Sequence, residues 1–126
     1  EAKQHDYILS ITSHIPHLIA FNIVNTSMNI EGENESSIVK YSAGGLRDFT
    51  RIAASNPIMW RDVFIQNKKN TSNMIDNFIT NLEDLKKTIE NEDGKKLEEI
   101  FTKTKKIRKE IVKAGQDVGK PDFGRK

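Results

Sequence analysis

Apolar residues recur every three or four positions over the first part of the chain, from about residue 3 to residue 28. This series comprises Tyr7, Ile8, Ile11, Ile15, Leu18, Ile19, Ile23 and Val24. The spacing places them on one face of a long amphipathic helix. Pro16 falls in the middle of that helix, where it has no N–H to donate and its ring clashes with the carbonyl of Thr12. The sequence therefore predicts a first helix that is kinked between His14 and His17.

The centre of the chain predicts shorter elements. The polar run from Glu31 to Ser37 is typical of a surface loop, and Ala43-Gly44-Gly45 of a tight turn. A short helix is expected from Leu46 to about Ala54. Ser55-Asn56-Pro57 then marks a new helix start, because a capping side chain is followed by proline in the first turn. That helix should run from Pro57 to about Gln66.

Two further apolar stripes predict a pair of long helices. The first stripe comprises Met74, Ile75, Phe78, Ile79, Leu82, Leu85 and Ile89, and the second comprises Leu97, Ile100, Phe101, Thr104, Ile107 and Ile111. Glu92-Asp93-Gly94 separates them, so the helices should pack as an antiparallel hairpin whose second member ends near Ala114. The tail from Gly115 to Lys126 is expected to be extended and docked at most through Phe123. Ser37 to Ser42 is the nearest approach to a strand, and the predicted fold class is all-α.

Composition narrows the function classes. The chain has 126 residues, enough for one domain, and no cysteine, which excludes disulfides and thiolate sites. Its 20 basic and 18 acidic side chains are too balanced to indicate a nucleic-acid or membrane partner. The basic run near the C-terminus alternates with isoleucines and is typical of the polar face of a helix. No uninterrupted apolar run approaches the roughly 20 residues of a membrane span, so a soluble chain is expected. The lack of cysteine is compatible with the cytoplasm, which is the expected location.

The start of the chain suggests a piece of a longer polypeptide. It begins at Glu1 without methionine, already inside the predicted first helix. We therefore expect the chain to be one domain of a larger protein.

A first candidate site is the segment Ser13-His14-Ile15-Pro16-His17, where two imidazoles lie one turn apart. The alternative is that one histidine caps a helix or packs in the core and another faces water. A metal site is not expected, because the nearest carboxylate on that face, Asp6, is roughly 12 to 16 Å away at the helical rise.

A second candidate site begins at Gly44-Gly45, which leads into a helix bearing Arg47 and Arg51. Arginines four residues apart share a helix face, and their guanidinium groups bind carboxylate or phosphate in a bidentate manner. The alternative is a solvated face on which Asp48 pairs locally with the arginines. Trp60 is the only tryptophan, and a lone tryptophan on a helix is more often a core residue than a ligand contact.

Taken together, several segments in this order and spacing resemble prephenate and arogenate dehydrogenases. They are His5-Asp6, Ser13-His14-Ile15-Pro16-His17, the run from Ala43 to Ala53, the run from Asn56 to Asp62, and, as in cyclohexadienyl-type members, Ala114-Gly115-Gln116-Asp117 and Pro121-Asp122-Phe123-Gly124-Arg125. The resemblance implies that residues 1–126 form the C-terminal helical domain, which dimerises and supplies one wall of the substrate cleft. The N-terminal Rossmann domain, which binds NAD or NADP and carries the histidine base, would be absent from this chain.

The resemblance also implies roles for particular residues in the oxidative decarboxylation of prephenate or arogenate. Arg51 would bind a substrate carboxylate, with Arg47 and His17 nearby and the backbone of Gly44 and Gly45 close to the ligand. Trp60 would lie at the cleft or the subunit boundary. The residues expected to support the site or the interface are His14, Ser13, Asp6 and Asp48. One departure is Arg47, a position that is often lysine in relatives.

Two other readings remain open at this stage. The chain could be a self-contained helical dimerisation or adaptor module whose arginines hold only surface ion pairs. It could also contribute to regulation, since the family is often inhibited by tyrosine near the cleft. In relatives the long helices interlock across a two-fold axis, so the resemblance implies a homodimer.

Overall fold

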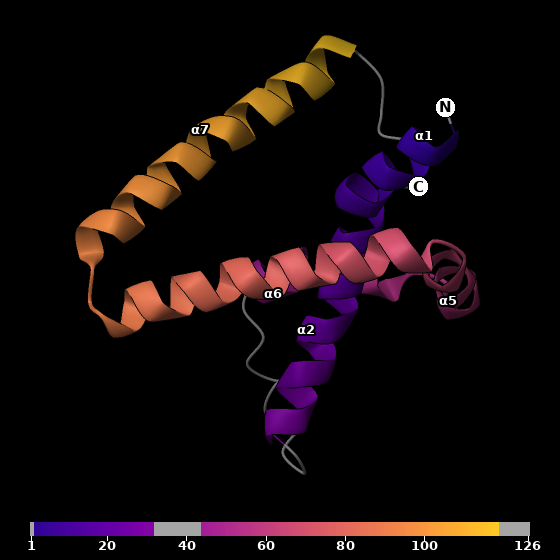
Figure 1. The fold of residues 1–126 in the computed structure, drawn as a ribbon, viewed down its shortest axis with the longest axis horizontal. Helices are drawn as coiled ribbons and strands as arrows, with labels where there is room; N and C mark the ends of the chain where they lie inside the picture. Colours follow the sequence, from indigo (N-terminus) through magenta and orange to yellow (C-terminus); the bar gives the residue numbers. More distant parts are fainter. Residues whose placement is uncertain (1, 32–43, 119–126) are drawn as a thin grey trace. The chain divides into compact units, whose positions relative to one another are not determined.

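A computed structural model of the chain describes residues 2–31 and 44–118 (Figure 1). Every regular element in these two ranges is helical, which confirms the all-α class. Several expectations fall outside the described residues: the loop after Glu31, the strand candidate at 37–42, Ala43 of the glycine turn, and the tail beyond Val118 with Phe123.

The predicted first helix is present and its irregularity has a defined form. It consists of α1 (Ala2–Leu9), a π-helical turn η1 (Ser10–His14) and α2 (Ile15–Glu31). In the π-turn the N–H of Ile15 donates to the carbonyl of Ser10, five residues back. This wide turn directly precedes Pro16, whose missing N–H disrupts the α-helical hydrogen bonding there. The irregularity predicted at Pro16 is therefore a π-helical turn at Ser10–His14, just before the proline.

Within the described residues the buried apolar side chains are few: Ile15, Ala20 and Trp60. α2, which carries the first two, packs against the short helix η3 (Arg51–Ala54). Many large apolar side chains remain exposed in the single chain. By length and composition alone the stretch Ala2–Ser27 could also cross a membrane, a measure that core helices of soluble proteins meet as well.

The central segment differs from the single helix that was expected from Leu46 to about Ala54. α4 (Gly44–Phe49) ends before Thr50, and the chain then continues as the 3₁₀-helix η3. The Thr50 hydroxyl donates to the carbonyl of Leu46 at 2.7 Å. The main-chain carbonyl of Thr50 accepts from the N–H of Ala53, three residues later, at 2.8 Å, which is the tighter turn of a 3₁₀-helix. A threonine that bonds back to the preceding turn favours such a change of helix type.

α5 (Pro57–Gln66) confirms the predicted helix at both ends. The side chain of Asn56 accepts hydrogen bonds from the N–H groups of Ile58 and Met59, at 2.9 and 3.2 Å. These two bonds satisfy donors that have no partner within the first turn, and Pro57 occupies a position where no N–H is needed. Trp60 lies in α5 about one turn after Asn56.

The two long helices follow as α6 (Lys68–Glu90) and α7 (Gly94–Val118). Glu92 takes a left-handed backbone conformation with a φ of 53° in the turn, and the carboxylate of Asp93 accepts from the N–H of Lys96 at 3.1 Å. α7 continues past Ala114 to Val118, so the expectation of an extended chain from Gly115 is wrong over those residues. Helix formers such as Ala114 and Gln116 and the absence of a proline before Pro121 allow this extension.

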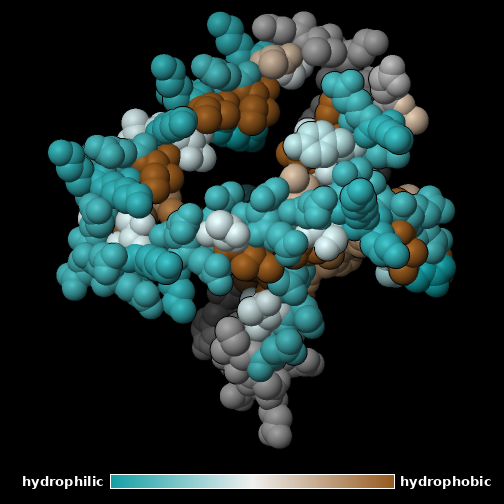
Figure 2. All heavy atoms as spheres, viewed as in Figure 1, coloured by the Kyte–Doolittle hydropathy of each residue, from teal (hydrophilic) through white to brown (hydrophobic). Residues whose placement is uncertain are grey.

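The chain divides into two compact units, residues 1–78 and 79–126. In the second unit the expected hairpin packing is not found: from the turn, α7 leads away from the second half of α6 (Figure 1). Their stripes are exposed, and Figure 2 shows apolar atoms at the surface of both helices; the exposed members are Ile79, Leu82, Ile89, Phe101, Ile107 and Ile111. Periodicity identifies a face that needs covering, but not the surface that covers it.

Candidate functional site

Trp60 joins α5 to the first helix through both histidines of the Ser13–His17 segment. Its ring stacks on that of His17, with the centroids 3.9 Å apart and the planes inclined by 21°. His14 meets the same indole edge-on, at 6.0 Å and 79°, and Phe64 lies 5.4 Å away within α5. Trp60 is 8% exposed, so the indole at the centre of this aromatic cluster is buried. Both the stacked and the edge-on arrangement are favourable for aromatic rings.

Asn67 links the same two elements through hydrogen bonds. Its amide nitrogen lies 3.0 Å from the carbonyl oxygen of Asp6 and 3.1 Å from Nδ1 of His14. Its amide oxygen accepts from the side chain of Asn70 at 3.1 Å. The carbonyl of Asp6 can only accept, which requires the nitrogen of Asn67 on that side. The orientation of the Asn67 amide is therefore set by its partners.

These contacts determine whether Nδ1 of each imidazole carries a proton. Because the Asn67 amide donates to His14, Nδ1 of His14 is unprotonated and the ring proton is on Nε2. Burial lowers the pKa of His14 below its ordinary value of 6.5; the carboxylate of Asp6 opposes this shift and the neighbouring His17 adds to it. Nδ1 of His17 lies 2.8 Å from the carbonyl of Ser13 and donates to it. Nε2 of His17 is then the nitrogen available to a ligand.

The arginines are placed differently from the prediction. Arg47 lies on α4 and Arg51 begins η3, so the two are not on one continuous helix. The change of helix type at Thr50 separates them. Both are exposed, and η3 packs against α2, the helix that carries His17. Arg51 therefore starts the segment that lies against the histidine helix.

The local ion pair weighed for Asp48 is not observed. Within the described residues the side-chain ion pair is that between Arg61 and Asp62, at 2.9 Å, while Asp48 is exposed on α4. Nor do three or more histidine and carboxylate side chains cluster as metal ligands in the described part of the chain.

Gly44 and Gly45 form the first turn of α4. Among the described residues, and apart from its chain neighbours and the backbone of its own helix, a methyl group added at either position would meet no atom within 4 Å. Packing against the described residues therefore does not require glycine at these two positions.

Two of the expected supporting residues contribute main-chain groups. The carbonyl of Ser13 accepts from His17, and the carbonyl of Asp6 accepts from Asn67. Sequence analysis did not identify Asn67, although its position between two predicted helices was a signal that it could cap or bridge them. Its partners lie on the first helix, far away in sequence, where no periodicity connects them.

Comparison with known proteins assigns the family. Residues 1–103 match the family model described as the dimerization domain of prephenate dehydrogenase. The chain belongs to the prephenate dehydrogenase family. This confirms the resemblance seen in the sequence motifs.

Relatives of known name agree with this family. The chain is 38% identical to a cyclohexadienyl dehydrogenase of Zymomonas mobilis over 85% of its own length and 36% of the relative. It is 36% identical to a prephenate dehydrogenase of Bacillus subtilis over 84% of its length and 28% of the relative. The chain thus spans about a third of the length of these curated relatives.

Solved structures of the family have the same fold. The prephenate dehydrogenase of Aquifex aeolicus, in complex with hydroxyphenyl propionate and NAD+, is 42% identical, with a TM-score of 0.80 over 86% of this chain and 38% of that one. A second structure of the A. aeolicus enzyme gives 39% identity and a TM-score of 0.77.

Proposed function

We propose that this chain forms one wall of the substrate cleft of a cytoplasmic prephenate or arogenate dehydrogenase, and that it also holds the two subunits together. The full enzyme would catalyse the NAD- or NADP-dependent oxidative decarboxylation of prephenate to 4-hydroxyphenylpyruvate, or of arogenate to tyrosine. The observation that supports this most directly is the stacking of Trp60 on His17. The stacked ring also bonds through Nδ1 to the carbonyl of Ser13, which leaves Nε2 for a ligand on the helix against which the Arg51 segment packs.

The chemistry of these residues suits an anionic substrate. Prephenate carries two carboxylates, and arginine binds carboxylate through two parallel N–H groups. Arg51 would bind one carboxylate, with Arg47 nearby, and Nε2 of His17 would donate to or accept from a polar group of the substrate. The lack of a side chain at Gly44 and Gly45 would admit the ligand close to the backbone. The task of these residues is to hold the ring in one orientation.

The remaining parts of the reaction are assigned to the rest of the enzyme. The described residues contain no strand, so they lack the strand-turn-helix unit that binds a dinucleotide at its glycine-rich turn. NAD or NADP, which accepts hydride when bound, would be held by a preceding Rossmann domain, together with the histidine base. This chain alone would then be inactive.

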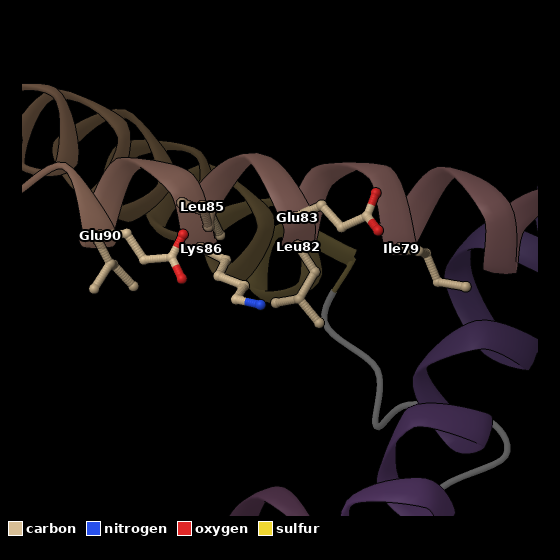
Figure 3. Close-up of a pocket in the computed structure, with 7 residues that line it drawn as sticks. Ile79, Leu82, Glu83, Leu85, Lys86 and Glu90 are labelled. Carbon is tan, nitrogen blue, oxygen red and sulfur yellow. The ribbon is translucent and has the colours of Figure 1, made fainter.

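The dimer would be formed by the exposed apolar faces of the second unit. An open groove along α6 is lined by Ile79, Leu82, Glu83, Leu85, Lys86, Ile89 and Glu90. Figure 3 shows Ile79 and Leu82 projecting from the same side of the helix. The apolar stripe of α7 is exposed as well. The matched family model is named for dimerization, and a second copy of the chain would cover these faces.

The carboxylate contact can be tested by kinetics of the full-length enzyme. Arg51→Ala should raise KM for prephenate or arogenate and reduce kcat/KM by an amount equivalent to about 2 to 5 kcal/mol, the cost of breaking a charge pair that bound substrate would bury. Arg61→Ala is the matched control, because Arg61 is exposed and paired with its neighbour Asp62. A kcat/KM for Arg51→Ala equal to that of the control would show that Arg51 does not bind substrate.

A further inference from the structure

We propose that Asn67 is a positioning residue that fixes the tautomer and orientation of His14, and that it thereby keeps Trp60 seated on His17. The inference rests on the proposed substrate site, to which His17 belongs. Asn67 lies outside the motifs that carry the family resemblance. It contacts Asp6 and His14 and not His17, the residue proposed to face the substrate.

The first step is the direction of the Asn67 hydrogen bonds. Asn70 donates to the oxygen of Asn67, and the carbonyl of Asp6 accepts from its nitrogen. A flipped amide would place its oxygen against the carbonyl of Asp6 and its NH₂ against the NH₂ of Asn70, and would lose both bonds. The NH₂ group therefore faces Nδ1 of His14, at 3.1 Å. Asn67 can donate to that nitrogen but cannot accept a proton from it.

The second step is the effect on the His14 ring. A proton on Nδ1 would point at the Asn67 NH₂ group, so Asn67 opposes both the Nδ1–H tautomer and the imidazolium. Two ionisable groups influence the ring: the carboxylate of Asp6 favours the charged form and His17 disfavours it. The hydrogen bond also holds the plane of the ring in place.

The third step connects His14 to the ligand side. His14 touches the indole of Trp60 edge-on, and the same indole stacks on His17. When His14 is held in place, the indole of Trp60 is bounded by His14 at one contact and by His17 at the other. The indole and the His17 ring then cannot tilt independently of each other. His17 is held in turn by its bond to the carbonyl of Ser13. Asn67 therefore limits the movement of the imidazole that would face the substrate.

The test uses the full-length enzyme with ¹⁵N-labelled histidine and compares Asn67→Ala with Asn73→Ala. Asn73 is an exposed asparagine on α6, the helix that begins directly after Asn67, and serves as the control. In the wild type and the control, NMR should show His14 with its proton on Nε2 alone. In Asn67→Ala the Nδ1–H tautomer should appear. KM should rise about three- to tenfold, the equivalent of one hydrogen bond, with kcat changed by less than about twofold.

Asn70→Ala provides a second variant should Asn67→Ala not fold. It removes only the bond to the Asn67 oxygen, so the same two changes should appear in weaker form. A single Nε2–H tautomer of His14 in the variant that folds would overturn the inference.

Kinetics separate this inference from the proposed function. If the tautomer changes while KM stays at the wild-type value and Arg51→Ala raises it, Asn67 does not position the site, and the inference is wrong although the proposed function stands. If Arg51→Ala and His17→Asn also leave KM unchanged, the proposed function is wrong and so is the link from Asn67 to substrate binding.

Discussion

The indole of Trp60 lies almost parallel to the imidazole of His17, at a centroid distance of 3.9 Å. This contact joins α5 to the first helix at a point where the single chain buries few apolar side chains. A stacked aromatic pair contributes about 0.5 to 1.5 kcal/mol beyond the area it buries. The same indole would both stabilise the first unit and orient a ligand-binding imidazole.

Removal of the indole should therefore affect stability. Trp60→Ala should lower the free energy of unfolding by about 3 kcal/mol, because a nearly buried aromatic ring is replaced by a cavity. Trp60→Phe, which keeps an aromatic face for His17, should cost about 1 kcal/mol. Urea denaturation followed by circular dichroism at a fixed protein concentration measures both values.

Gln66→Ala is the control for these substitutions, since Gln66 is exposed at the end of the same helix. It should change the free energy of unfolding by less than about 0.5 kcal/mol. Equal stability of Trp60→Ala and this control would show that the stacked pair does not hold α5 to the first helix.

The lowered pKa of His14 predicts a pH dependence of stability. Because the folded-state pKa lies below 6.5, the unfolded chain takes up a proton at this position more readily than the folded chain. The stabilising contribution is complete above the unfolded-state pKa and is lost as pH falls through the folded-state pKa. The free energy of unfolding should therefore decrease as the pH falls from about 7 through and below 6.5, the ordinary histidine pKa.

Replacement of His14 measures how much this imidazole contributes to the pH dependence of the free energy of unfolding. His14→Gln should flatten the dependence of unfolding free energy on pH over that window, whereas His5→Gln, at an exposed position of α1, should leave it unchanged. Denaturation curves at four or more pH values give the slopes. Parallel slopes for His14→Gln and the wild type would contradict an origin at His14.

The exposed stripes of α6 and α7 predict which substitutions dissociate the dimer. Leu82 is 54% exposed and Phe101 56% exposed in the single chain. Leu82→Glu or Phe101→Glu would bury a carboxylate in the interface and should weaken dimerisation by at least about 2 kcal/mol. Sedimentation velocity should show a shift toward a species of one chain, 14.4 kDa for this chain alone.

Lys106→Glu introduces the same carboxylate on the polar side of α7, where Lys106 is exposed. It should leave the dimer intact. A monomeric wild type, or a Phe101→Glu variant that dimerises as tightly as Lys106→Glu, would exclude these faces as the interface.

The local elements of this protein follow from short stretches of sequence. Asn56 and Pro57 predict the start of α5 because the cap and its donors lie within three residues of each other. The apolar stripe from Met74 to Ile89 likewise predicts α6. The family resemblance also depends on local motifs in order along the chain. Where a local interaction was overlooked, as with the Thr50 hydroxyl, the predicted helix was wrong.

Contacts between distant segments were decided only by the tertiary structure. No spacing in the sequence indicates that Asn67 forms a hydrogen bond with His14, or that Trp60 stacks on His17. Nor does the periodicity of α6 and α7 reveal that their apolar faces remain uncovered within one chain. Helical periodicity and capping involve residues within about one turn of each other, so they can be predicted from neighbouring positions in the sequence. Which side chains pack against one another depends on how whole helices come together. The sequence by itself determined the all-α class, most of the helices and the family, and the packing of α5 and the start of α6 on the first helix decided which side chains meet at the site.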